Sequence, residues 1–124
     1  MPAKLVSVSK GVEYQLIGRV TMKDLLDVSK AFYQSDIKGW HSIIADLTQL
    51  ESLELEEDDV DVFAGLDAGF DSMTRNMKMA FVVDDDQFMP LVNAYINKMN
   101  NRGTSWHFKI THDLSDAKTW VTKS

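Results

Sequence analysis

The stretch that decides the fold is VEYQLIGRVTMKDLLDVSKAFYQ, residues 12–34. Alternating side chains predict a strand over residues 12–20. Thr21 has the hydroxyl of a helix N-cap, and Asp24 follows three residues later, in the relation of a capping box. The helix expected behind this cap has an apolar face made of Met22, Leu25, Leu26 and Phe32. A strand that passes directly into a capped helix predicts a β-α unit.

The rest of the chain extends this unit in both directions. A strand over residues 5–9 precedes it, and Lys10 and Gly11 are expected to form the tight turn of an N-terminal hairpin. Further strands are predicted at 42–47 (SIIADL), 78–83 (KMAFVV) and 106–110, and helices at 60–73, 88–99 and 115–121, the last capped by Ser115. Gly103 is expected to stop the helix at 88–99. The predicted order is β-β-α-β-α-β-α-β-α.

This order predicts an α/β fold with a mixed, mostly parallel sheet of about five strands and about four helices. Parallel neighbours need crossover connections, which the helices supply. The length of 124 residues and the lack of a linker-like tract indicate a single domain over residues 1–124.

Several of these segments together resemble the SpoIIAA-like branch of the STAS domains, the sulfate-transporter and anti-sigma-factor-antagonist family. They are YQLIGRVTMKDLLDVSKAF (14–32), IIADLTQLE (43–51), the second expected helix, KMAFVV and the closing SDAKTWV. The resemblance covers roughly residues 5–122. It implies a domain that acts by binding partners, nucleotides or lipid-like ligands, without catalysis.

Anti-sigma-factor antagonists of this fold carry an Asp-Ser-x-x-Gly type phosphoacceptor loop after a strand that ends in Asp-Leu-Ser or Asp-Leu-Thr. Here Asp46, Leu47 and Thr48 match that step, but the serine position falls on or near Leu55, and the glycine is absent. Seven acids between residues 51 and 61 would also repel a phosphate. We therefore expect no phosphorylation switch, and we interpret the acids as the first turn of the second helix.

No catalytic residue, metal site or cofactor is predicted. Acids lie at the carboxyl ends of three predicted strands: Asp46, Asp84–Asp86 and Asp113. A Mg²⁺ or Ca²⁺ site is therefore one alternative, with a Mg-dependent hydrolase as a distant third function. Helix capping and turn formation are the other interpretation of these acids. His107 and His112 are expected on opposite faces of a strand. No G-x-S-x-G or G-x-G-x-x-G motif occurs.

Charge and composition restrict the partners. The net charge of −6 disfavours nucleic acid and anionic membranes. The N-terminus lacks the apolar core of a signal peptide, and no apolar run approaches the roughly 20 residues needed to span a bilayer, so a cytoplasmic location is expected.

Apolar side chains supply the leading functional hypothesis. Five methionines fall between the second expected helix and the end of the third, either as a methionine-rich core or as an adaptable wall: Met73, Met77, Met79, Met89 and Met99. The predicted ligand-binding residues of these two helices are Phe63, Phe70, Met73, Phe88, Val92, Tyr95 and Met99. We expect them to hold an apolar, lipid-like ligand in a regulatory or carrier domain with weak peripheral membrane contact. The alternative is a protein-interaction module, anti-sigma-antagonist-like but without the phosphoacceptor serine, that forms a homodimer.

Overall fold

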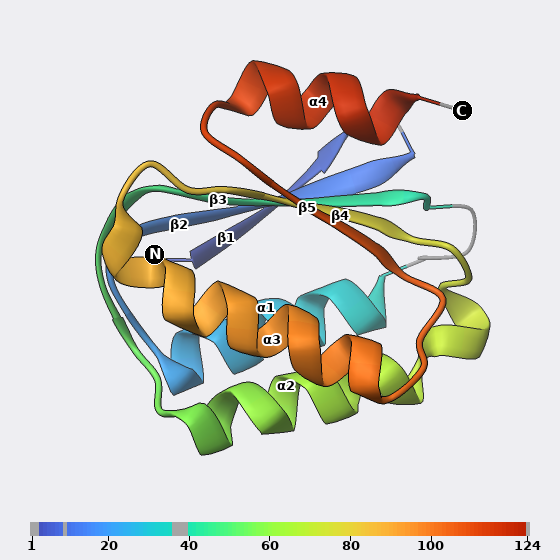
Figure 1. Ribbon diagram of the computed structural model, residues 1–124, viewed down its shortest axis with the longest axis horizontal. Helices are drawn as coiled ribbons and strands as arrows, with labels where there is room; N and C mark the ends of the chain where they lie inside the picture. Colours follow the sequence, from blue (N-terminus) through green and yellow to red (C-terminus); the bar gives the residue numbers. More distant parts are fainter. Residues whose placement is uncertain (1–2, 9, 36–39, 124) are drawn as a thin grey trace.

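A five-stranded sheet runs through the centre of the molecule (Figure 1). The computed structural model describes residues 3–8, 10–35 and 40–123. The strands lie side by side in chain order: β1 (Ala3–Val8), β2 (Gly11–Thr21), β3 (Ser42–Glu54), β4 (Lys78–Val82) and β5 (His107–Thr111). β1 pairs antiparallel with β2, and the pairs from β2 to β5 are parallel. The predicted mixed, mostly parallel sheet is confirmed.

Helices cover both faces of this sheet. Figure 1 shows α1 (Met22–Gln34), α2 (Glu57–Gly69) and α3 (Met89–Asn101) on one face and α4 (Leu114–Thr122) on the other. Short 3-10 turns, η1 (Asp71–Met73) and η2 (Asp86–Phe88), follow α2 and precede α3. The larger core lies between the sheet and α1–α3, and a smaller one lies beneath α4. Alternate side chains of β3 and β4 therefore enter different cores.

The N-terminal hairpin forms, but Gly11 belongs to β2 and not to the predicted turn. Val8 pairs with Gly11. Lys10 has a φ of +61°, whereas Ser9, the last residue of the first expected strand, lies outside the described residues. Gly11 is required because a Cβ there would lie 2.6 Å from the carbonyl oxygen of Ser42 on β3. The glycine thus permits close approach of β2 and β3.

The capping box at the start of α1 is confirmed. The Thr21 Oγ1 accepts a hydrogen bond from the Asp24 backbone N–H at 3.3 Å, and the Asp24 carboxylate accepts one from the Thr21 N–H at 2.9 Å. Two N–H groups that would otherwise lack helical partners are satisfied in this way. Because Thr21 is also the last residue of β2, the sheet and α1 are joined without a loop.

β3 is much longer than the predicted strand at 42–47. It pairs with β2 up to Glu54, and its register shifts by one residue twice, between Gln15 and Ile17 and between Gly18 and Arg19 of β2. An extra residue in one strand reverses which side chains face each side of the sheet. The two shifts therefore turn three leucines, spaced three apart, toward the same core: Leu47, Leu50 and Leu53.

Two helix boundaries also differ from the sequence prediction. α2 ends at Gly69, so Phe70 and Met73 lie beyond it, and Met73 in η1 is 60% exposed. Asp113, not Ser115, caps α4, because its side chain accepts a hydrogen bond from the Asp116 N–H at 2.8 Å. The predicted strand at 78–83 and the predicted helix at 88–99 agree with β4 and α3 to within two residues.

Candidate functional site

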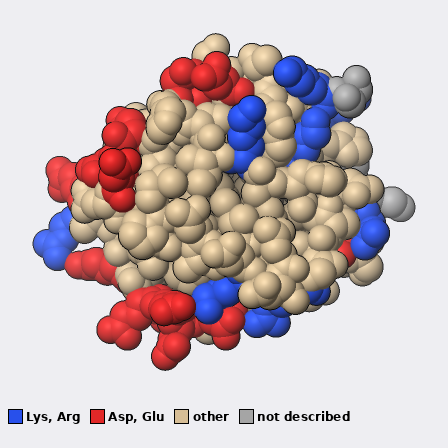
Figure 2. All heavy atoms as spheres, in the orientation of Figure 1, with Lys and Arg blue, Asp and Glu red and all other residues tan. Residues whose placement is uncertain are grey.

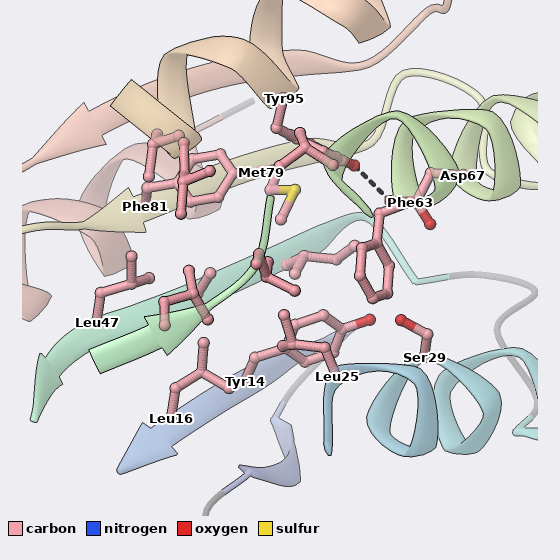
Figure 3. Close-up of a pocket in the computed structure, with 17 residues that line it drawn as sticks. Tyr14, Leu16, Leu25, Ser29, Leu47, Phe63, Asp67, Met79, Phe81 and Tyr95 are labelled. Carbon is pink, nitrogen blue, oxygen red and sulfur yellow. Dashed lines mark hydrogen bonds between the residues drawn. The ribbon is translucent and has the colours of Figure 1, made fainter. Parts of the chain in front are cut away.

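A cavity of about 110 Å³ lies between the sheet and helices α1–α3 (Figure 3). Of the 17 residues that line it, most are apolar, and they come from β2–β4, from all three helices and from the connection after β3. The apolar lining consists of Leu16, Leu25, Ile43, Ala45, Leu47, Leu53, Leu55, Val60, Phe63, Met79, Phe81, Leu91 and Val92. A concave site of this composition is typical of small-molecule pockets.

The polar groups of the lining include the carboxylate of Asp67 on α2, which accepts hydrogen bonds from two tyrosines. Tyr33 of α1 donates its hydroxyl proton to Oδ1 at 2.5 Å, and Tyr95 of α3 donates to Oδ2 at 2.5 Å. Figure 3 shows the bond from Tyr95. Asp67 and Tyr95 line the cavity, so α1, α2 and α3 are tied together at its wall.

The protonation states follow from burial. Burial raises the pKa of Asp67 to about 6, and the hydrogen bonds from Tyr33 and Tyr95 act in the opposite direction. Burial and the nearby Asp67 also raise the pKa of Tyr95, of Tyr33 and of Tyr14 on β2. At neutral pH the carboxyl group is therefore largely ionised and the tyrosines keep their protons.

Two further hydroxyls complete the polar part of the lining. Tyr14 reaches the cavity from β2, and Ser29 reaches it from α1. In Figure 3 their oxygen atoms point toward each other. The hydrogen bonds found among the described residues include none from either hydroxyl.

The predicted site residues divide into two groups. Phe63, Val92 and Tyr95 line the cavity. The other four do not: Phe70 stacks on Tyr33 with a ring-centroid distance of 4.1 Å, Met73 is exposed, and Phe88 and Met99 are buried in the core.

The cavity overlaps the predicted site but is not confined to it. The sequence hypothesis placed the site between the second and third helices. Tyr95 of α3 lines the cavity, whereas Asn93 of the same helix is exposed and lines a polar surface hollow with Asn97 and Lys98. The apolar cavity is instead bounded on one side by the sheet, which the hypothesis did not include.

Asp67 is the main residue that sequence reasoning missed. It stands seven residues after Val60 and four after Phe63, which are both buried on α2, so it occupies the apolar stripe of its own helix. A carboxylate on the buried face of a helix is uncommon and indicates a polar site in the interior. The sequence hypothesis considered only the apolar side chains of this helix and therefore passed over the carboxylate.

Three of the acids considered as metal ligands have other partners. Asp46 accepts from both the backbone N–H and the hydroxyl of Thr48, Asp85 caps η2, and Asp113 caps α4. Within the described part of the chain, no three His, Cys, Asp or Glu side chains are grouped to hold a metal ion.

We expect no stoichiometric phosphate on residues 48–57. The hydroxyls there lie on β3 and not in a loop: Thr48 donates to Asp46 at 2.7 Å, and the Ser52 Oγ is buried. A kinase needs an accessible hydroxyl on a segment that it can bind in extended form, and a paired strand does not provide one. Phosphopeptide mapping of the protein from its native cells checks this, and extensive modification of Thr48 or Ser52 would contradict it.

Of the helices that the structure describes, none is long and apolar enough to cross a membrane. In Figure 2 acidic side chains gather over the N-terminal end of α2, where Glu57, Asp58 and Asp59 form the first turn. This end of the molecule presents negative charge to any partner.

The fold and the site together define an α/β domain architecture with an apolar cavity between its sheet and three of its helices. Its arrangement of strands and helices is the SpoIIAA-like fold. A similar solved structure is the crystal structure of an uncharacterized protein of the DUF3478 family from Shewanella loihica PV-4, which has a SpoIIAA-like fold. The two chains are 18% identical, with a TM-score of 0.57 over 96% of this chain and 91% of that one.

This likeness confirms the predicted fold. No protein-family model matches the chain, and no curated protein matches it.

Proposed function

We propose that this protein is a non-enzymatic binding domain that holds a small apolar, lipid-like ligand in the cavity between the sheet and α1–α3. The observation that carries the proposal is the cavity lining, which is apolar except for Asp67, Tyr95, Tyr14 and Ser29. Small-molecule sites combine an apolar wall with a few polar groups in the same way.

The volume limits what the cavity takes. An engineered apolar cavity of about 150 Å³ is known to hold benzene, so about 110 Å³ suits a single ring or a short alkyl segment. The cavity is partly open to the surface, so a longer chain would extend out of it. Membrane contact would be weak and transient, because the net charge of −6 opposes binding to anionic lipid.

Filling the cavity tests the proposal. Ala45 of β3 is 4% exposed and lines the cavity, so Ala45→Leu places a larger side chain in the space that a ligand needs. We expect toluene to bind the unaltered protein, with changes in the amide resonances of lining residues. Ala45→Leu should weaken this binding by at least about tenfold, or about 1.4 kcal/mol.

Ala31→Leu is the matched control, because it makes the same change on the exposed face of α1 and should leave toluene binding unaltered. Circular dichroism would establish that both variants are folded. If neither toluene nor a charged derivative with the same phenyl ring changed the lining resonances of the unaltered protein at saturation, ligand binding would be rejected in favour of the interaction module.

A further inference from the structure

The polar groups around Asp67 offer hydrogen-bond acceptors to the cavity. Tyr33 and Tyr95 each give their hydroxyl proton to one carboxylate oxygen at 2.5 Å. Those protons are therefore not free for a ligand, while the oxygen lone pairs of Asp67 and Tyr95 remain. A ligand group that meets this wall must itself be a donor.

Among the residues that the structure describes, no cation pairs with the charge of Asp67. None of the residues that line the cavity is Lys, Arg or His. The ion pairs found among the described residues all involve other carboxylates. A carboxylate that is largely removed from water without a cation is unfavourable, and a positively charged ligand would relieve this.

The other hydroxyls suit the same ligand. Tyr14 and Ser29 line the cavity, and a hydroxyl oxygen accepts as well as donates. An ammonium group has three N–H donors, and Asp67, Tyr95 and one of these two hydroxyls present an equal number of acceptor groups. A carboxylate ligand would instead bring a second negative charge toward Asp67.

We propose that the ligand of this cavity is a small apolar amine, bound by its ammonium group at Asp67 and by its ring or short alkyl body among the leucines. This inference rests on the proposed function and deepens it by naming the head group. It also implies that fatty acids, which carry a carboxylate, bind poorly, because a like charge opposes them.

Three probes with the same phenyl ring separate head group from body: toluene, benzylamine and benzoate. In NMR titrations at neutral pH we expect benzylamine to bind about tenfold more tightly than toluene, and benzoate to bind more weakly than toluene. Asp67→Asn should bring the affinities for benzylamine and toluene within about twofold of each other. Asp58→Asn removes the same charge from an exposed site on α2 and should leave the tenfold preference unchanged.

A second measurement needs no variant. Lowering the pH below the pKa of Asp67, about 6, should remove the preference for benzylamine in the unaltered protein. In the described part of the chain, the titratable groups that face Asp67 are Tyr33 from α1, Tyr95 from α3 and Tyr14 from β2. All three stay protonated over this range because their pKa values are raised.

The outcomes distinguish the two proposals. Equal binding of toluene, benzylamine and benzoate to the unaltered protein would overturn the amine inference and leave the binding function standing. A preference for benzylamine that survives both Asp67→Asn and acidic pH would also overturn it, because the attraction would then come from the acidic surface. Failure of all three probes to bind would overturn the proposed function itself, and the amine inference with it.

Discussion

Phe32→Ala is expected to lower the free energy of unfolding by about 3–5 kcal/mol, because it removes a fully enclosed ring. Phe32 of α1 is 1% exposed, and its ring packs against Trp40 and Tyr14 at centroid distances of 5.6 and 6.1 Å. A domain is usually stable by only about 5–15 kcal/mol, so the variant should lose a large part of its stability. Urea denaturation, followed by tryptophan fluorescence, measures the change.

Phe70→Ala serves as the comparison within the same aromatic group. Phe70 is half-buried and stacks on Tyr33 at 4.1 Å, so its truncation should cost clearly less than that of Phe32. A loss below about 1 kcal/mol for Phe32→Ala would contradict the enclosed packing described for α1.

Asp67→Asn is expected to change how stability depends on pH. Burial raises the pKa of Asp67 from an ordinary 3.8 to about 6, so the native state holds this proton more tightly than the unfolded chain does. The stability that this group contributes is therefore full below about pH 4 and is lost as the pH rises through about 6. One pKa unit corresponds to about 1.4 kcal/mol, so the loss amounts to at most about 3 kcal/mol.

The difference in the free energy of unfolding between the original protein and Asp67→Asn isolates the contribution of Asp67. Asp24, Asp71 and Asp85 have pKa values that hydrogen bonds lower, so they contribute in the opposite direction in both proteins. The asparagine side chain still offers an oxygen to one tyrosine and an N–H to the other. The free energy of unfolding of the original protein minus that of Asp67→Asn should therefore fall between about pH 4 and about pH 7. Parallel curves would mean that Asp67 titrates in the native state as it does in water.

Local patterns were enough to predict most of the secondary structure. The strand and capped helix of residues 12–34, the buried strand at 78–83 and the helix before Gly103 all appear close to where they were expected. Each depends on neighbours in the chain: alternation over a few residues, a cap three residues from its partner, or a glycine with positive φ at 103. The α/β class and the mostly parallel sheet followed from the order of these elements.

The length of β3 was decided by tertiary structure. Leu47, Leu50 and Leu53 are spaced three apart, which is not the spacing of a regular strand, so the prediction stopped at Leu47. Pairing with β2 absorbs two extra residues of β3 and turns all three side chains toward one core. Only the neighbouring strand shows this, because a bulge is defined by what lies opposite it.

Of the residues that line the cavity, the sequence predicted Phe63, Val92 and Tyr95 as site residues, and the others could not be predicted from it. The sequence by itself placed apolar faces on the second and third helices, and those faces exist. The tyrosines that bind Asp67 lie 28 and 34 residues away along the chain. The strands that close the cavity come from segments on both sides of α2. A buried acid in the apolar stripe of a helix is tolerated only when hydrogen-bond donors from other segments reach it. Only the tertiary structure shows whether they do.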